Sequence, residues 1–285
     1  MNKDPHDMSD IVHINPWLEL KRYTSARIAL GRTGVSLPTE ALLAFGLAHA
    51  QARDAVHQPL EVAALTKALH ATGHKVLTVH SAATSREEYL RRPDLGRRLN
   101  DASRLLLSQL PQTEADLASL EYQTRQAEAD LVIMLGDGLS STALHQNALP
   151  FIEALQPHLR RLGLACVPLV IASQARVALG DEVGELLRAR AVLVMIGERP
   201  GLSSPDSLGL YLTWQPRVGC MDSQRNCVSN VRPAGLDFPQ AAHKLAWLLE
   251  QAFNRRLTGV ALKDESGELA SLIEHDSPLP PCRPA

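Results

Sequence analysis

Residues 191–235 read AVLVMIGERPGLSSPDSLGLYLTWQPRVGCMDSQRNCVSNVRPAG, and this stretch decides how the rest of the chain is interpreted. It opens with a continuous apolar run at 191–196, which is typical of a strand buried on both faces of a sheet. The remainder is rich in glycine, proline and polar residues, a composition that predicts a loop. Open α/β sheets bind ligands at loops that leave the carboxyl ends of their strands. We therefore expect a functional loop at 197–235, against the simpler alternative of a surface excursion with ordinary turns.

Strand and helix patterns alternate on both sides of this stretch. Short apolar runs predict further strands at 75–79, 131–135 and 165–172, with a last strand at 260–264. Helical periodicity predicts helices at 38–57, 60–71, 144–162, 181–190 and 239–256, with the third of these broken near Pro150 and ended by Gly163. Strands that alternate with helices predict an α/β fold in which helices flank a Rossmann-like, mostly parallel sheet.

The same patterns suggest an order of regions along the chain. Residues 1–16 and 276–285 read as flexible tails, because they are polar or proline-rich and carry no periodic apolar pattern. Residues 17–110 form a helical N-terminal region that contains only one short strand, and its segment 85–110 is interrupted by Pro93 and Gly96. Residues 111–275 form the Rossmann-like domain.

Composition excludes several classes of protein. With 45% hydrophobic and 21% charged residues, the 285-residue chain has an ordinary globular composition. A formal net charge of −2 and an aromatic content of 4% argue against nucleic acid as a partner. No apolar run approaches the roughly 20 residues of a membrane span, and the N-terminus lacks the apolar core of a secretion signal. The four cysteines form no CxxC pair, so we expect a cytoplasmic, reducing setting.

The sequence GDGLSS at 136–141 follows a predicted strand and opens a predicted helix. It lacks the third small residue of the dinucleotide fingerprint, and no acidic residue follows the next strand, so NAD is not expected. The amide groups at this helix start remain a candidate site for an anionic ligand, with an ordinary tight turn as the alternative. Metal-ligand spacing and hydrolase or Walker motifs are missing from the sequence, so we assign no catalytic and no metal-binding residue.

A basic cluster is formed by Arg91, Arg92, Arg97 and Arg98. Such a cluster is usually a solvated face. The alternative is a surface that docks another chain or an anionic ligand.

The sequence also resembles a known family over roughly residues 17 to 265. The segments GERPGLSSPDSLGLYLTW and RVGCMDSQRNCVSNVRPAGL are similar to the small subunit of ethanolamine ammonia-lyase. The resemblance extends through RIALGRTG, AHAQARDAVH, RRPDLGRRL, DLVIMLGDGLS, AAHKLAWLL and LTGVALKD. It implies an adenosylcobalamin-dependent lyase that acts only together with a large subunit, which carries the radical chemistry, and that converts ethanolamine to acetaldehyde and ammonia.

The resemblance also implies where the cofactor lies. It carries cobalamin contacts onto Val177, Glu198 and Cys227, which places the cofactor against the domain at 111–275. As residues alone, Glu198 is a strong acceptor or a salt-bridge partner of Arg199, and Cys227 is a small contact residue or a core cysteine. The DxHxxG signature of histidine-ligated cobalamin does not occur, so the cofactor is expected base-on.

The family further implies a heteromeric complex with the large subunit and, in some bacteria, packaging in a microcompartment. Two alternatives from other classes remain open at this point. One is a stand-alone α/β enzyme that acts on a phosphorylated or nucleotide substrate through GDGLS and GERPGLSSPDS. The other is a non-catalytic docking protein that uses the arginines of RRPDLGRR.

Overall fold

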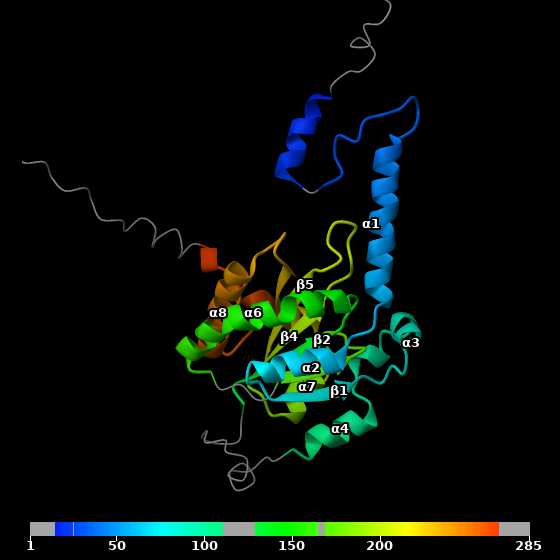
Figure 1. The fold of residues 1–285 in the computed structure, drawn as a ribbon. Coiled ribbons are helices and arrows are strands. Elements are labelled where there is room, and N and C mark those ends of the chain that lie inside the picture. The colour runs from blue at the N-terminus through cyan, green and yellow to red at the C-terminus, as the bar shows by residue number, and fades with distance from the viewer. Residues whose placement is uncertain (1–14, 25, 111–128, 165–168, 268–285) are drawn as a thin grey trace, which may run out of the picture.

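A six-stranded mixed sheet forms the centre of the molecule (Figure 1). The computed structural model describes residues 15–24, 26–110, 129–164 and 169–267. The strands are β1 Val76–His80, β2 Leu131–Gly136, β3 Leu169–Ser173, β4 Ala191–Gly197, β5 Leu208–Trp214 and β6 Arg225–Val231. Their order in the sheet is β1-β3-β2-β4-β5-β6; the first four pair in parallel, and β5 runs antiparallel to both of its neighbours, β4 and β6. The α/β class is confirmed, and the sheet is mixed.

Helices cover both faces of this sheet (Figure 1). The helical elements are η2 Pro16–Tyr23, α1 Thr39–His57, α2 Val62–Ala71, α3 Arg86–Arg91, η3 Leu95–Arg97, α4 Asp101–Ser108, α6 Ser141–Leu162, α7 Leu179–Leu186, η5 Asp222–Gln224, α8 Phe238–Arg255 and η6 Gly259–Ala261. Helices α2, α6 and α8 pack on one face, and α4 and α7 pack on the other. From β2 the chain crosses through α6 to β3, on one side of β2 in the sheet. From β3 it crosses through α7 to β4, on the other side of β2. The two crossovers run in opposite directions across the sheet, so both are right-handed only if their helices lie on opposite faces, as they do.

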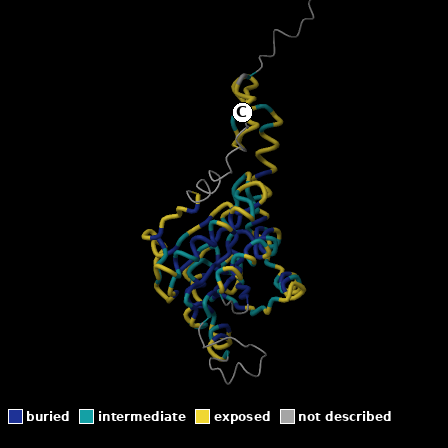
Figure 2. The backbone as a smooth tube through the Cα atoms, turned by 90° about the vertical axis from the view of Figure 1, so that its left-hand side faces the viewer, coloured by how far each residue is buried: buried dark blue, intermediate teal, exposed yellow. Residues whose placement is uncertain are grey.

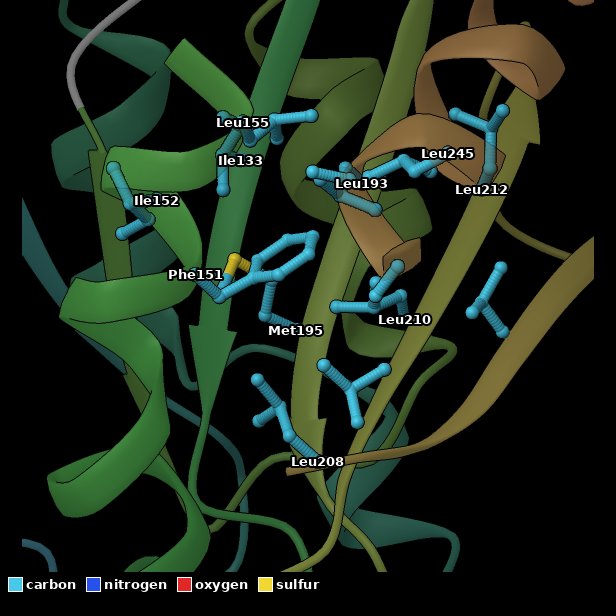
Figure 3. Close-up of a cluster of buried hydrophobic side chains, with 14 of the residues drawn as sticks. Ile133, Phe151, Ile152, Leu155, Leu193, Met195, Leu208, Leu210, Leu212 and Leu245 are labelled. Carbon is cyan, nitrogen blue, oxygen red and sulfur yellow. The ribbon is translucent and has the colours of Figure 1, made fainter. Parts of the chain in front are cut away.

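The central strands divide their side chains between two apolar clusters. In β4, Leu193 and Met195 face the α6–α8 side, whereas Val192 and Val194 face the α7 side. Because both faces are covered by helices, these strands consist of continuous apolar runs. Figure 3 shows the cluster on the α6–α8 side, where Phe151 of α6 lies among strand side chains. Burial of each large apolar side chain contributes about 2 kcal/mol to this core.

The segment expected to be a loop at 197–235 contains two strands, so that prediction was wrong. Strand β5 pairs with β4, and β6 pairs with β5. Leu208, Leu210 and Leu212 alternate along β5 and enter the cluster on the α6–α8 side. The predicted loop is therefore reduced to two connections, one at 198–207 and one at 215–224, and to the turn that follows β6.

Two further predictions were wrong. Helix α6 runs without a break through Pro150 and Pro157, and it begins at an N-cap serine, Ser140. Its apolar stripe packs on the sheet, and that packing outweighs the backbone hydrogen bond that each proline removes. Residues 260–264 form no strand: η6 lies there, held by Asn226, whose Nδ2 donates to the carbonyl groups of Gly259 and Leu262.

Helix α1 projects from the rest of the molecule together with η2 (Figure 1). Figure 2 shows that this N-terminal arm is mostly exposed. Only Ala48 and Ala55 of α1 are buried, and the exposed side chains include Leu42, Leu43, Phe45 and Leu47.

Some predictions fall outside the described residues. These are the tail at 276–285, the tail at 1–14 and the start of the expected strand at 165–168. The final residue of the predicted N-terminal tail begins η2. No helix in the described part of the chain combines the length and apolar character needed to cross a membrane.

Candidate ligand-binding surface at the carboxyl edge of the sheet

The carboxyl ends of β2, β3 and β4 meet at one edge of the sheet. Asp137 follows β2 and is buried between the two neighbouring strand ends. Its Oδ1 accepts the N–H of Ala175 at 2.8 Å, and its Oδ2 accepts the N–H of Gln174 at 2.9 Å. Burial raises the pKa of Asp137, while these N–H donors and the guanidinium of Arg86 oppose the shift. The carboxylate therefore ties the loop after β2 to the loop after β3.

Arg86, from α3, joins this edge to the end of α1. Its Nε donates to the carbonyl of Val56 at 2.8 Å, and its Nη1 donates to the carbonyl of Gly138 at 2.8 Å. Two guanidinium groups contact the buried ring of Tyr89: the Cζ atom of Arg86 is 4.8 Å from the ring centroid, and that of Arg176 is 4.4 Å from it. These contacts make Arg86 and Tyr89 structural supports of the edge.

The start of α6, within GDGLSS, is already engaged by the chain itself. The N–H of Leu139 donates to the carbonyl of Gly197, and the hydroxyl of Ser140 donates to the carbonyl of Pro205 at 2.6 Å. Gly138 lies so close to β4 that an added Cβ would sit 2.2 Å from the carbonyl oxygen of Gly197. This packing favours the tight turn over an anion site and removes the main support for a stand-alone enzyme.

Glu198 stands directly after β4 and is half-buried. The hydroxyl of Ser207 donates to its Oε2, and the N–H of Asn230 donates to the same oxygen at 3.2 Å. These partners, rather than Arg199, hold the carboxylate. The interpretation of Glu198 as an acceptor is therefore the one that fits its geometry.

Cys227 lies on β6, directly opposite Tyr211 of β5. Its side chain is exposed, so the alternative of a core cysteine was wrong. The Tyr211 side chain lies beside the thiol across this strand pair. Although the residue is exposed, the atoms packed around its sulfur desolvate the thiol and raise its pKa; the neighbouring Tyr211 hydroxyl opposes this shift, and the charge of Glu198 adds to it.

Glu198 and Cys227 belong to one continuous surface. Gly209 lies between them on β5, and a Cβ added there would be 3.0 Å from both Glu198 Oε1 and the Tyr211 ring. We call Glu198, Gly209, Tyr211 and Cys227 the β5 strip. It lies on the α7 side of the sheet, while α8 packs behind it on the opposite face. The β5 strip thus gathers a carboxylate, a phenol and a thiol, with the buried Gly209 beneath the Glu198 and Tyr211 side chains.

Val177 lies at the start of α7, in the loop after β3. It is half-buried and packs against the cluster on the α7 side, as Tyr211 does. All three predicted site residues therefore lie on the same side of the sheet. Tyr211 lies next to two of them, because Cys227 is its partner across the strands and Glu198 Oε1 shares with its ring the space over Gly209.

Sequence reasoning missed the residues that hold this surface in place. Ser207 and Asn230 contact Glu198 from 9 and 32 positions along the chain. No local pattern marks such pairs, because they depend on how β5 and β6 fold back beside β4. The alternating leucines of β5 were the one signal that could have located the strip.

The basic cluster of RRPDLGRR is partly neutralised by neighbouring acids. Arg91 pairs with Glu87 at 2.7 Å, and Arg92 pairs with Asp94 at 2.7 Å, all on exposed side chains. Ion pairs of this kind are ordinary for a solvated face.

The fold and the strip together define an α/β protein with a polar surface beside the carboxyl edge of its sheet. No group of three or more potential metal ligands occurs among the described residues. The family profile described as "Ethanolamine ammonia-lyase light chain (EutC)" matches residues 14–263. The chain belongs to this family.

Individual relatives agree with the family match. The "Ethanolamine ammonia-lyase small subunit" of Pseudomonas fluorescens strain Pf0-1 is 51% identical over 266 residues, which cover 93% of this chain and 91% of the relative. The protein of the same name from Ralstonia nicotianae is 51% identical over 264 residues, with 93% and 94% covered. That from Pseudomonas aeruginosa strain LESB58 is 52% identical over 252 residues and covers 88% of each chain.

Proposed function

We propose that the chain is the small subunit of an adenosylcobalamin-dependent ethanolamine ammonia-lyase, which converts ethanolamine to acetaldehyde and ammonia together with a large subunit. Family membership over nearly the whole chain supports the reaction and the partner. The observation that carries the cofactor contact is the β5 strip, where Ser207 and Asn230 hold the carboxylate of Glu198 at an open surface.

The residues of the strip suit cobalamin by their chemistry. Cobalamin is a flat macrocycle fringed by amide groups, so a binding face needs acceptors for N–H donors and small side chains that allow close approach. Glu198 supplies the acceptor, Cys227 is a small side chain at the surface, and the buried Gly209 leaves room for Glu198 to lie against the sheet. Val177 adds an apolar contact at the start of α7. When bound, adenosylcobalamin supplies a radical by homolysis of its cobalt–carbon bond.

The role of this chain is to bind and orient the cofactor and to keep water from it. Glu198 accepts a hydrogen bond from the cofactor's periphery, and Val177 and Cys227 pack against it. The sequence lacks the DxHxxG signature that would supply a histidine ligand, so we expect the cofactor to be held base-on. Substrate binding and radical chemistry are assigned to the large subunit.

The exposed apolar side chains of α1 support assembly with that partner. A helix that is apolar on several sides is normally buried, yet Leu42, Leu43 and Leu47 are exposed. We propose that the large subunit, the partner that the family name implies, binds this surface of α1. We further propose a cytoplasmic location, with packaging in a microcompartment where the host organism forms one.

Ethanolamine-dependent acetaldehyde release tests this function. We expect activity with adenosylcobalamin only when this chain and the large subunit are co-expressed, and none from either alone. Full activity of the large subunit alone would refute an obligatory role for this chain. Turnover by this chain alone would favour a stand-alone enzyme.

A further inference from the structure

Ser207 is a buried serine that makes two contacts with Glu198. It is 4% exposed and stands immediately before β5. Its carbonyl accepts the N–H of Glu198 at 2.9 Å, and its hydroxyl donates to Oε2 of the same residue. The backbone contact holds Glu198 at the end of β4, and the hydroxyl contact fixes the direction of its side chain.

The two oxygens of Glu198 have different surroundings. Ser207 and the N–H of Asn230 both donate to Oε2. Among the hydrogen bonds of the described residues, none ends on Oε1. This oxygen lies over Gly209, beside the Tyr211 ring, because a Cβ added to Gly209 would be 3.0 Å from it. One oxygen is therefore anchored, and the other lies above the buried Gly209 with its hydrogen-bonding capacity unused by the described residues.

We propose that Ser207 is a positioning residue, which anchors Oε2 of Glu198 so that Oε1 accepts one N–H or O–H group of the bound cofactor. The inference rests on the proposed function and names the contact in more detail. A hydrogen bond to a charged acceptor depends on direction, so a carboxylate that rotates freely binds a fixed donor less well. Loss of the anchor should weaken binding by about three- to tenfold.

The test uses the assembled enzyme and hydroxocobalamin, which binds without turnover. Equilibrium dialysis of the complex of both subunits gives the Kd for Ser207→Ala, Glu198→Gln and the double variant. We expect Ser207→Ala to raise the Kd about three- to tenfold in the wild-type background and by less than twofold in the Glu198→Gln background. The proposal is overturned if Ser207→Ala leaves the Kd unchanged. It is also overturned if the increase in Kd of the double variant equals the product of the increases caused by the two single substitutions.

Further variants separate positioning from folding. Ser207→Thr keeps the hydroxyl and should restore the Kd to within about twofold of wild type. Ser229→Ala removes an exposed hydroxyl from β6 and should leave the Kd unchanged. If Ser207→Ala fails to assemble, as judged by gel filtration, Ser207→Cys gives the same comparison, because a thiol of similar size donates a weaker hydrogen bond.

A second probe identifies the donor. Cobinamide keeps the amide fringe but lacks the ribose and the lower base. If Ser207→Ala weakens the binding of cobinamide and of hydroxocobalamin equally, the donor is an amide group. If it weakens the binding of hydroxocobalamin alone, the donor is a ribose hydroxyl. Either result supports the role of Ser207. If Glu198→Gln binds both probes normally, the proposed cofactor contact fails. If Ser207→Ala binds both probes normally but Glu198→Gln does not, only the positioning role of Ser207 fails.

Discussion

Arg225 of β6 and Asp181 of α7 form a two-pronged ion pair whose side chains are 3% and 2% exposed. Nη1 of Arg225 donates to Oδ1 of Asp181, and Nη2 donates to Oδ2 at 2.7 Å. The guanidinium also donates to the hydroxyl of Thr213 and to the carbonyl of Cys220. The pair connects the helix that follows Val177 to the strand that carries Cys227, so it fixes the two sides of the candidate surface relative to each other.

Removal of one member of this pair should destabilise the chain. Arg225→Met leaves Asp181 buried without its partner, and we expect a loss of about 3–5 kcal/mol in the free energy of unfolding. Urea denaturation of the purified chain measures it. Arg92→Met is a matched control, since Arg92 pairs with Asp94 on the surface and should change stability by about 0.5 kcal/mol or less. Equal effects of the two substitutions would show that burial of the Arg225 pair is unimportant.

Glu198→Ala should weaken cofactor binding. Removal of the carboxylate eliminates one charged hydrogen bond to cobalamin, which corresponds to about a tenfold increase in Kd. Titration of the assembled enzyme with adenosylcobalamin, followed by acetaldehyde release, measures the change. Asp101→Ala, at an exposed position at the start of α4, serves as the control. An unchanged Kd would remove Glu198 from the binding surface.

Cys227 should react slowly with iodoacetamide, and more slowly still in the complex. The residue is exposed, but atoms packed around its sulfur desolvate the thiol and raise its pKa, so at a given pH the folded chain carries less thiolate than the unfolded chain does. Mass spectrometry of the peptide that contains Cys227 measures the alkylation rate as a function of pH. The pH at which this rate increases should therefore be higher for the folded chain than for the chain unfolded in urea. Assembly with the large subunit and cobalamin should then protect the thiol. Identical rates with and without partner and cofactor would contradict its place at the interface.

The central strands could be predicted from sequence because each is buried on both faces. The continuous apolar runs of β2 and β4 indicate directly that both faces of these strands are buried. Strand β6 could not be found in the same way. Its buried valines, Val228 and Val231, are three residues apart, because the pairing of β5 with β6 shifts register between Leu208 and Leu210. A bulge of this kind destroys the two-residue period by which strands are recognised.

The candidate surface was predictable only in part. Glu198 follows a recognisable strand, so its place at the edge was expected, and the family resemblance supplied Val177 and Cys227. The anchoring of Glu198 was not predictable, because the partner residue Asn230 reaches it only after β5 and β6 have formed. Tyr211 was missed for the same reason, since only strand pairing brings it to Cys227.

Gly138→Ala should destabilise the fold strongly. Gly138 has a φ of +57°, and an added Cβ would lie 2.2 Å from the carbonyl oxygen of Gly197. The β2 loop or β4 would have to move, and we expect a loss of at least about 2–4 kcal/mol in the free energy of unfolding. Gly46→Ala is the matched control, because Gly46 lies within α1 and nothing approaches its Cβ position. That substitution should be neutral or stabilise the chain by about 0.5–1 kcal/mol. Similar losses at both positions would indicate that the close approach of Gly138 to β4 is not what matters.

Leu43→Gln distinguishes an exposed partner surface from part of the core. The Leu43 side chain is 67% exposed on α1, so its replacement removes little apolar burial within the chain. We expect the urea midpoint of the isolated chain to stay within experimental error, because substitutions at exposed sites rarely exceed about 0.5 kcal/mol. Assembly with the large subunit should weaken at least about fivefold, since an apolar anchor at an interface contributes 1 kcal/mol or more. Dilution of the co-expressed complex, followed by gel filtration, measures the assembly. A normal complex combined with a lowered urea midpoint would mean that Leu43 supports the fold of α1, and the partner would then have to bind elsewhere.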